Sequence, residues 1–483
     1  MTIEQQIYLN SLQQPNHVAL IAGEQQVTYS QLWERCLLAA TNMCKKYHLK
    51  QGDRIILAAS ANIDFIYTYF GIHIAGGVCV PIAPDTNQTR YELIRESTSP
   101  VCTMGVLQKV VDYEVVPFND ALSFCEQVDE YKEPNPEQIA DVLFTTGTTG
   151  APKGVALNYR NLTAAALNIN TFIENTSDDV ELLALPISHS FGLGRVKCVL
   201  AKGGTLVLLG SFASMKRFFG QLEKYHCTGF GMVPASWGYI KKMSGQKIGQ
   251  FADQLKYVEI GSSFMSKEDK ELLMELLPNT RICMHYGSTE ASRSSFMEFH
   301  SCKEDLLTAG HASPNCDIKI FSSEGKELPH GEEGEVCVKG DHVTCSYWDE
   351  SAERFAADFY GDYFRTGDSG VQDDRGYIYL KSRIKEMINV GGKKVAPMEV
   401  EDMLNAIPGI KESACVAMSD PDGVMGELVK AFVVCSDESL TDVAILDALR
   451  PKLEVYKLPA VIERIAEIPK TSSGKIQRLK LKK

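Results

Sequence analysis

The stretch Leu143-Phe144-Thr145-Thr146-Gly147-Thr148-Thr149-Gly150-Ala151-Pro152-Lys153-Gly154-Val155 joins the end of an apolar run to a cluster of hydroxyls, glycines and one lysine. Its glycines let backbone N–H groups approach an anion, and its threonines add hydroxyl donors. The order differs from a Walker A loop, because Lys153 follows Pro152 and precedes Gly154. The stretch therefore predicts a phosphate-binding loop of another kind, after a buried strand. A Thr-rich surface turn without a ligand is the alternative.

Length and composition narrow the remaining possibilities. A chain of 483 residues exceeds one ordinary core, so two or three domains are expected. The net charge of −13 disfavours nucleic acid or an anionic membrane surface as the partner. The 14 cysteines form no Cys-x-x-Cys pair, which favours reduced thiols over disulfides or zinc. Without a signal peptide or a membrane-length apolar run, we expect a cytoplasmic protein with no integral membrane segment.

Strand-like and helix-like runs alternate through much of the chain. Residues 53–59 and 78–82 have the length and apolar character of buried strands, and 62–74 between them has helical spacing. Residues 31–47 also have helical spacing, with Ser30 as a plausible N-cap. This alternation predicts α/β crossover units and a doubly wound, mostly parallel sheet. Polar loops follow several of the strands, so they can converge on one crevice.

From residue 317 the pattern changes to short strands separated by Gly, Glu and Asp. This change indicates a small β-rich module over about 317–383. Residues 384–483 then read as a last, small α+β segment. We therefore expect a large N-terminal domain, 1–383, that includes the module, and a small C-terminal domain, 384–483.

Three further motifs follow the Thr-Gly loop in order. They are Tyr286-Gly287-Ser288-Thr289-Glu290, the run from Tyr363 to Asp368 with Arg383, and Pro469-Lys470-Thr471-Ser472-Ser473-Gly474-Lys475. Together the four resemble the adenylate-forming (AMP-binding) superfamily, which includes acyl- and aryl-CoA synthetases, luciferases and the adenylation domains of peptide synthetases. The resemblance spans essentially the whole chain and implies that 384–483 is a mobile lid.

The motif residues have chemistry that suits a nucleotide. The Tyr286 ring can stack on a purine, and a carboxylate such as Asp368 can hold both ribose hydroxyls with help from Arg383. Glu290 suits Mg²⁺, a hard ion, and Thr289 can donate to an α-phosphate. Asp368 as a turn residue and Glu290 as a helix N-terminal charge are the alternatives. The resemblance implies a nucleotide-binding set of Thr145, Thr146, Gly147, Thr148, Thr149, Gly150, Lys153, Gly261, Ser262, Ser263, His285, Tyr286, Gly287, Ser288, Asp368 and Arg383.

Lys475 is the strongest catalytic candidate, together with Thr289 and Glu290. Its ammonium can reach both a substrate carboxylate and the α-phosphate, where charge develops during reaction. An ordinary solvated lysine is the alternative. The resemblance implies two half-reactions. A carboxylate attacks Mg-ATP to give an acyl-adenylate and pyrophosphate, and a thiol then takes the acyl group and releases AMP.

The same resemblance assigns residues to the later steps and to the acid. Lys385 matches the hinge position, and Gly391 and Gly392 match the loop that enters the site for thioester formation. The acyl or aryl pocket would include His189, Phe191, Gly192, Val233 and Ser236. The first three lie in 187–194, which is expected to be a Gly-rich loop after a strand at 180–186. His189 as a satisfied loop histidine is the alternative.

Gly192 bears on the substrate, because relatives that activate α-amino acids usually carry an aspartate there. Without that counter-charge we expect an acyl or aryl acid. The chain ends eight residues after Lys475, so no carrier domain is expected to follow and coenzyme A is the favoured acceptor. Loading of a free-standing carrier-protein phosphopantetheine, a non-catalytic nucleotide-binding regulator and a luciferase-like oxygenase remain the other readings.

Overall fold

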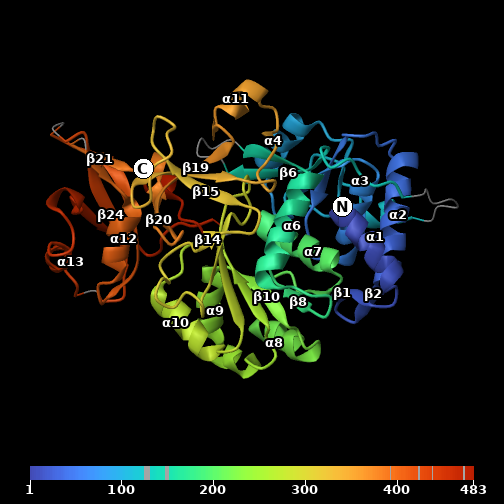
Figure 1. Cartoon of the computed structure of the whole chain (residues 1–483), viewed down its shortest axis with the longest axis horizontal. Helices are drawn as coiled ribbons and strands as arrows, with labels where there is room; N and C mark the ends of the chain where they lie inside the picture. The colour runs from blue at the N-terminus through green and yellow to red at the C-terminus, as the bar shows by residue number, and fades with distance from the viewer. Residues whose placement is uncertain are drawn as a thin grey trace. The chain divides into compact units, whose positions relative to one another are not determined.

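The computed structural model describes residues 1–123, 131–146, 152–391, 393–422, 425–437, 439–471 and 474–482 (Figure 1). The chain forms two compact units. The first comprises Met1–Asp317 and Val338–Phe364, and the second comprises Ile318–Cys337 and Arg365–Lys483. The boundary at residue 383 that the sequence suggested stays a prediction.

The first unit contains a nine-stranded sheet in the order β14-β13-β12-β11-β10-β8-β9-β1-β2. Its middle strands run parallel, and antiparallel pairs close both edges. The strands are β1 (Val18–Ala22), β2 (Gln25–Thr28), β8 (Val180–Leu183), β9 (Thr205–Leu208), β10 (Gly229–Met232), β11 (Tyr257–Ile260), β12 (Arg281–Tyr286), β13 (Ser295–Glu298) and β14 (His311–Ala312).

A second sheet of the first unit has the order β17-β7-β6-β4-β3-β5. Here β3, β4, β5 and β6 are parallel neighbours, whereas β7 returns antiparallel along β6 as a hairpin. The strands are β3 (Arg54–Ala58), β4 (Val78–Ile82), β5 (Cys102–Met104), β6 (Ile139–Thr146), β7 (Pro152–Asn158) and β17 (Ser346–Tyr347). The predicted doubly wound, mostly parallel α/β fold is thus confirmed.

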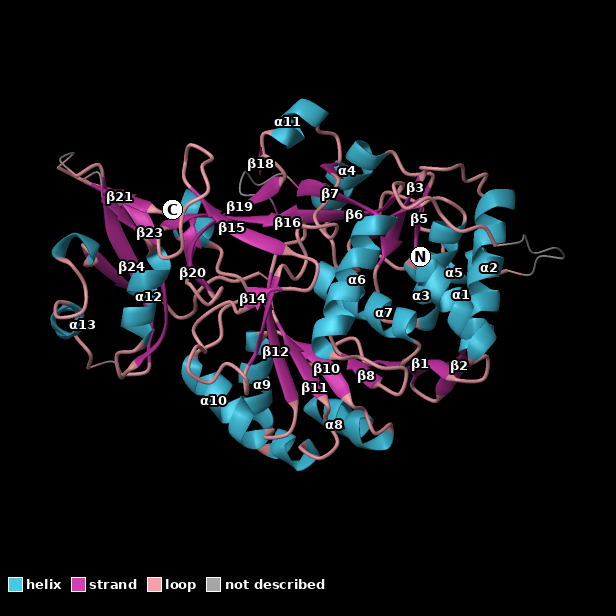
Figure 2. Ribbon diagram, viewed as in Figure 1, coloured by secondary structure: helices cyan, strands magenta, loops and turns pink. Residues whose placement is uncertain are grey.

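Helices lie between and around these two sheets (Figure 2). They are α1 (Ile3–Gln13), α2 (Tyr29–Lys45), α3 (Ile63–Ile74), α4 (Gln88–Thr98), α5 (Phe118–Ala121), α6 (Tyr159–Ile173), α7 (Ser190–Lys202), α8 (Met215–Lys224), α9 (Pro234–Ser244), α10 (Lys267–Leu276) and α11 (Ala352–Ala356), with a 3-10 turn at Lys247–Phe251. Helix α3 is buried over most of its length, which explains its nearly continuous apolar sequence. None of the helices in the described ranges is long and apolar enough to cross a membrane.

The start of α2 differs from the expectation. Its N-cap is Thr28, whose hydroxyl accepts the backbone N–H of Gln31 at 3.3 Å. The Gln31 side chain in turn accepts the Thr28 backbone N–H at 3.0 Å, which completes a capping box. Ser30, the cap expected from the sequence, lies inside the helix and donates to Glu34 instead.

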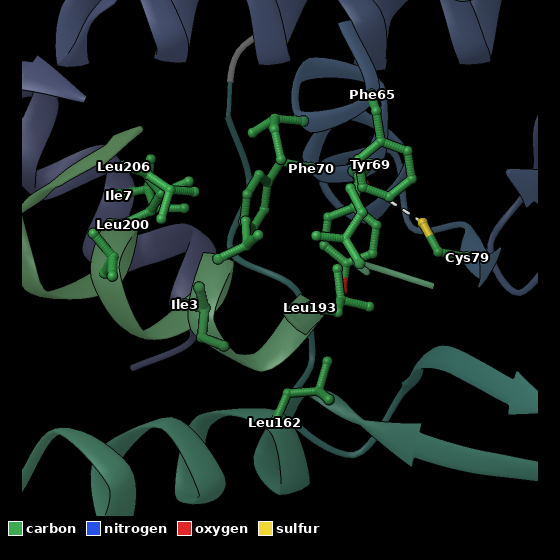
Figure 3. Close-up of a cluster of buried hydrophobic side chains, with 14 of the residues drawn as sticks. Ile3, Ile7, Phe65, Tyr69, Phe70, Cys79, Leu162, Leu193, Leu200 and Leu206 are labelled. Carbon is green, nitrogen blue, oxygen red and sulfur yellow. Dashed lines mark hydrogen bonds between the residues drawn. The ribbon is translucent and has the colours of Figure 1, made fainter. Parts of the chain in front are cut away.

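Apolar side chains from α1, α3, α6, α7 and the sheets form one large core (Figure 3). An ionic chain runs through this core. His73 lies 2.8 Å from Glu4 and 3.2 Å from Asp141, and Lys197 lies 2.6 Å from Asp141. The Tyr69 hydroxyl donates to the same Asp141 carboxylate at 2.8 Å. These contacts connect α1, α3, β6 and α7 through buried polar groups.

The second unit is built on three small sheets. Strands β15 (Asp317–Phe321), β16 (Glu333–Lys339), β19 (Tyr363–Gln372) and β20 (Ile378–Arg383) pair in that order. The short strand β18 (Phe359–Tyr360) falls in the first unit and pairs with the first two residues of β19. Strands β21 (Ile388–Val390) and β22 (Lys393–Val395) form a hairpin, and β23 (Ile410–Ser419), β24 (Glu427–Cys435) and β25 (Val461–Arg464) form the third sheet. The helices are α12 (Pro397–Asn405), α13 (Asp442–Leu449) and α14 (Arg478–Leu481), with 3-10 turns at Ile384–Glu386 and Val455–Lys457.

Candidate active site

The described ends of the Thr-Gly stretch lie on two paired strands, because Thr145 and Thr146 end β6 and Pro152 begins β7. Thr145 pairs with Lys153, and Thr146 pairs with Pro152. The Thr145 hydroxyl donates to the Lys153 carbonyl at 3.4 Å. The predicted phosphate-binding residues Gly147, Thr148, Thr149 and Gly150 lie outside the described residues. The strand pairing therefore brings Thr146 and Pro152 side by side.

The Lys153 ammonium lies among aromatic and acidic groups. It is 3.2 Å from the centroid of the Tyr347 ring, 3.2 Å from Glu350 and 3.9 Å from Asp358. The Tyr347 hydroxyl donates to Glu290 at 3.5 Å. Burial, followed by the nearby Glu290 charge, raises the Tyr347 pKa, so the phenol stays protonated and can donate. Lys153 and Glu290, which are far apart in sequence, therefore both contact the Tyr347 side chain.

Sequence reasoning missed Tyr347 and its acidic neighbours. Tyr347 is the last residue of strand β17, which pairs antiparallel with β7, so it faces Val155, two residues after Lys153. The Tyr-Trp-Asp-Glu run at 347–350 combines aromatic and acidic side chains and could have marked this segment.

The motif that contains Glu290 turns sharply after β12. The Ser288 backbone N–H donates to the Ala291 carbonyl at 3.1 Å, and the Ala291 N–H donates to the Ser288 hydroxyl at 3.2 Å. A Cβ on Gly287 would lie 2.5 Å from the Arg293 backbone nitrogen, so the turn needs glycine there. His285 and Tyr286 are the last residues of β12, and Thr289 and Glu290 lie within the turn.

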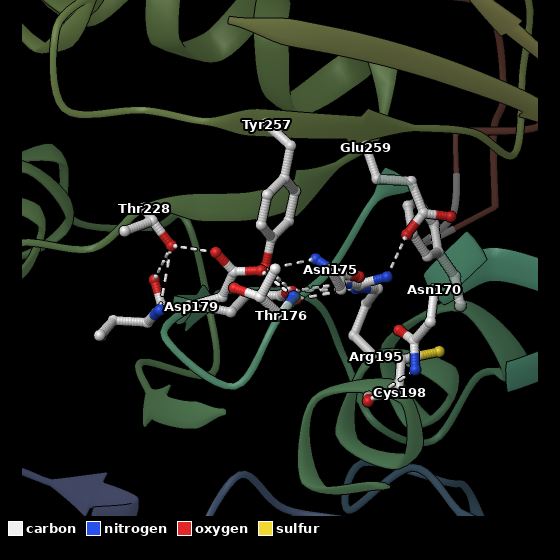
Figure 4. Close-up of polar contacts among 12 residues, drawn as sticks. Asn170, Asn175, Thr176, Asp179, Arg195, Cys198, Thr228, Tyr257 and Glu259 are labelled. Atoms are coloured by element: carbon white, nitrogen blue, oxygen red, sulfur yellow. Dashed lines mark hydrogen bonds and ion pairs between the residues drawn. The ribbon is translucent and has the colours of Figure 1, made fainter. Parts of the chain in front are cut away.

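The end of this turn is tied to buried charges. Arg293 donates to Glu259 at 3.1 Å, and Arg195 lies 3.2 Å from the other oxygen of Glu259 (Figure 4). Arg195 also donates to Glu181 at 2.9 Å, and Tyr257 donates to Glu181 at 2.6 Å. Arg195, Glu181 and Glu259 are all 0% exposed. Two acids and two arginines therefore balance one another inside the first unit.

His285 connects these charges to the predicted acid pocket. Its Nδ1 lies 2.8 Å from Glu259, and its ring packs edge-on to Phe191 with centroids 4.7 Å apart. Burial lowers the His285 pKa, although Glu259 opposes that effect, so the ring is neutral at pH 7. A Cβ on Gly261 would lie 2.1 Å from this ring, which covers the Gly261 backbone. The next residue, Ser262, has a left-handed backbone with φ of 77°, and Ser263 follows it.

The segment around His189 and Phe191 is not the Gly-rich loop expected from the sequence. Helix α7 begins at Ser190, with an exposed His189 as its N-cap residue. Phe191 is buried, and a Cβ on Gly192 would lie 2.3 Å from the Pro186 carbonyl oxygen. Gly192 thus faces backbone rather than open space. Val233 and Ser236, at the start of α9, are partly exposed.

A cavity of about 30 Å³ lies behind Thr289, which is room for one or two water molecules. Apolar side chains of β6, β7 and α6 form one part of its wall. Ser190, Lys197, Cys198, Arg293 and His342 also line it. The buried Lys197 ammonium thus borders this cavity and the Asp141 carboxylate.

In the second unit, the predicted ribose-binding pair comes together. Asp368 and Arg383 face each other on β19 and β20, with Arg383 Nε 2.8 Å from Asp368. Arg383 also donates to the Thr366 carbonyl at 3.1 Å. Gly367 has a φ of 74°, which L side chains rarely adopt, so this bend needs glycine. Sequence reasoning missed Glu335, which accepts the Gly367 N–H at 3.1 Å.

Lys475 lies in a turn near the end of the second unit. Its backbone N–H donates to the Thr471 hydroxyl at 3.1 Å, and its carbonyl accepts the Thr471 N–H at 2.8 Å. Arg478, which sequence reasoning also missed, donates from Nη2 to both carboxylate oxygens of Glu401 at 2.6 and 2.7 Å, and its Nη1 lies 3.1 Å from Glu386. The turn is therefore anchored through Arg478.

The residues assigned to the hinge and the thioester step are also in the second unit. Lys385 belongs to the 3-10 turn after β20, and Gly391 lies between β21 and β22 with a left-handed φ of 58°. Gly392 lies outside the described residues.

Sequence comparison places these features in a known family. The profile of the AMP-binding enzyme family matches residues 9–348, and that of its C-terminal domain matches residues 399–475. A long-chain-fatty-acid–CoA ligase of Mycobacterium tuberculosis is 29% identical over 489 residues, with 94% of this chain and 92% of the relative covered. The 4-coumarate–CoA ligase 1 of Narcissus pseudonarcissus is 29% identical, with 90% and 84% covered. An indoleacetate–CoA ligase of Aromatoleum aromaticum is 32% identical, with 70% and 65% covered.

Solved structures show the same fold. ATP-bound MatB from Rhodopseudomonas palustris matches with a TM-score of 0.89 and 24% identity, with 100% of this chain and 98% of that chain covered. The o-succinylbenzoate CoA synthetase MenE from Bacillus subtilis, in complex with an acyl-adenylate, matches with a TM-score of 0.88 and 22% identity, with 99% and 98% covered. The family expected from the four motifs is confirmed, as is the expected enzyme class: the chain belongs to the AMP-binding enzyme family and is an acid–thiol ligase.

Proposed function

We propose that this enzyme activates a fatty or related acyl acid with ATP and transfers the acyl group to coenzyme A. The carboxylate attacks the α-phosphorus, pyrophosphate leaves, and an acyl-adenylate results. The thiol sulfur then attacks the acyl carbonyl, and AMP leaves. By their names, the curated relatives join long-chain fatty acids, coumarate or indoleacetate to CoA. They share the carboxylic acid and the CoA acceptor, and they differ in the acid.

The meeting of Lys153 and Glu290 at Tyr347 is the observation that supports the proposal most directly. A triphosphate with its metal ion needs a cation for phosphate oxygens and a carboxylate for the metal. Both groups lie in the first unit beside the hairpin that carries the Thr-Gly loop.

Glu290 fits a magnesium ion. Its carboxylate is half-buried, and within the described ranges the neutral Tyr347 hydroxyl donates to it, which leaves its charge available. Bound there, Mg²⁺ would neutralise charge on the phosphate oxygens. Asp368 and Arg383 would hold the ribose, and Lys475 would neutralise charge on the carboxylate and the α-phosphate during the first step.

Carboxylate-dependent ATP–pyrophosphate exchange tests the first half-reaction. The Lys475→Ala variant should exchange about 10²–10³ times more slowly than the wild type, because it loses one positioned cation. Lys480→Ala is the matched control, since Lys480 is an exposed lysine five residues further along. If wild type and Lys475→Ala exchange equally fast, the catalytic role is wrong. If no acid supports exchange, the proposed function is wrong.

The acceptor is tested separately. CoA and a holo-carrier protein are each supplied with the acid and ATP, and the acylated product is identified by mass. CoA should be acylated, and acylation of the carrier alone would contradict the choice of CoA.

A further inference from the structure

Phe191 is predicted to line the acid pocket, and we call Phe191 together with the His285 and Arg293 side chains that pack against it the wall. Phe191 is 6% exposed. Its ring meets His285 edge-on at 4.7 Å, and the Arg293 guanidinium lies 4.8 Å from the same ring centroid. Arg293 also donates to the Phe191 carbonyl at 3.1 Å and to the Ser190 carbonyl at 3.2 Å. The aromatic ring therefore stands directly in front of polar groups.

Three glycines next to this wall are each in close contact with a side chain or a backbone group, which leaves no space behind the wall. The His285 ring covers Gly261, as the 2.1 Å approach to an added Cβ shows. An added Cβ on Gly194 would lie 2.8 Å from the Arg293 guanidinium, which occupies that side of α7. Gly192 faces the Pro186 carbonyl oxygen. Small residues at these positions therefore accommodate His285, Arg293 and the backbone, rather than a ligand.

The groups behind Phe191 are also costly to move. Arg195, Glu181 and Glu259 are wholly buried, and Arg293 is 2% exposed. A chain of methylenes that passed through this packing would separate one of these charges from its partner inside the protein, which leaves a buried charge unpaired. Two acids face two arginines, so the wall has no spare charge to bind a second charged group on the substrate.

We propose that His285 and the buried Glu181–Arg195–Glu259–Arg293 network close the acid pocket behind Phe191, and that the substrate is therefore a short, uncharged-tail carboxylic acid rather than a long-chain fatty acid. This inference rests on the proposed function. It assigns to His285 a specificity role in addition to the nucleotide contact expected from the sequence.

Chain-length profiles test the inference. Exchange is measured with acetate, butyrate, octanoate, palmitate and malonate as the acids. In a closed apolar pocket each misfitted methylene costs about tenfold or more in kcat/KM, so octanoate and palmitate should fall at least about 100-fold below the better of acetate and butyrate. The kcat/KM for malonate should be lower than that for butyrate, because Arg195 and Arg293 already have carboxylate partners.

The His285→Ala variant tests the wall itself. Since the pKa of His285 is lowered and the ring is neutral, its removal leaves Glu259 paired with both arginines. The ratio of kcat/KM for octanoate to that for butyrate should rise about tenfold or more, because the space over Gly261 opens. His330→Ala, at an exposed histidine, is the control and should leave the ratio unchanged.

The outcomes separate the two proposals. Wild-type activity with octanoate or palmitate within about tenfold of the best short acid overturns the closed pocket and leaves the ligase function intact. An unchanged ratio in a folded His285→Ala variant overturns the role of His285. If that variant does not fold, the wild-type profile still decides. Absence of exchange with every acid overturns the proposed function itself.

Discussion

Single side chains that are predicted to contact the nucleotide can be tested through the Asp368–Arg383 pair. Asp368→Ala should raise the KM for ATP about 10- to 100-fold, because the variant lacks the carboxylate that is proposed to accept two ribose hydroxyls. The KM is measured by titrating ATP in the exchange assay at saturating acid. Asp374→Asn, at a carboxylate that is 98% exposed, is the control. An unchanged KM in the Asp368 variant would remove that residue from the ribose site.

The sequence indicated those single residues that belong to a recognisable motif along the chain. The motif around Glu290 and the pair Asp368 and Arg383 were found in this way. Tyr347 and Arg293 were missed because each acts through a partner far away in sequence: Tyr347 reaches Lys153 across strand pairing, and Arg293 reaches Glu259 across the sheet. An isolated tyrosine or arginine carries no local pattern that reveals such a contact.

Alanine substitutions at two helical glycines are expected to change the free energy of unfolding in opposite directions. Gly192→Ala should lower the free energy of unfolding of the first unit by about 1–3 kcal/mol, because the new Cβ would lie 2.3 Å from the rigid Pro186 backbone. Gly220→Ala in α8 is the matched control, with nothing within 4 Å of its Cβ. It should raise the free energy by about 0.5–1 kcal/mol through helix propensity. Urea titrations measure the free energy of unfolding of both variants. If Gly192→Ala is not destabilised, the packing assigned to Gly192 is wrong.

The start of α7 was expected to be a loop because of its glycines. Gly192 and Gly194 lower local helix propensity, and no local pattern shows that they admit the Pro186 backbone and the Arg293 guanidinium. Elements with clear periodicity were easier: β4 has the predicted bounds, Val78–Ile82, and α3 starts one residue after the predicted 62. The N-cap at Thr28 was missed because Ser30 also suits a cap, and only the reciprocal bond to Gln31 decides between them.

The stability of the first unit as a whole should depend on pH through His73. Burial by itself lowers the pKa of this histidine, but Cys79, Asp141 and Glu4 raise it well above its ordinary value. A raised pKa stabilises the fold fully below about pH 6.5, and this contribution is lost as the pH rises through the folded-state pKa. From pH 6.5 to 8 the free energy of unfolding should therefore fall, by at most about 1.4 kcal/mol per pH unit.

The comparison of wild type with His73→Gln checks this dependence. Urea titrations at several pH values should give a weaker slope for the variant, which should also be less stable throughout because Glu4 and Asp141 lose a charged partner. His330→Gln, at an exposed histidine, should retain the wild-type slope. Equal slopes in wild type and His73→Gln would assign the pH dependence to other groups.

Cys198 lies in the wall of the cavity behind Thr289, and the protonation state of its thiol decides whether it could become acylated. Burial raises the pKa of this thiol to about 11. At pH 7 only about one molecule in ten thousand then carries the nucleophilic thiolate. Under the proposed function, a mixed anhydride formed close to Thr289 has a sulfur within the same protein interior, yet that sulfur is held in its unreactive form. Under the proposed function the activated acyl group would therefore pass to the external thiol rather than to Cys198.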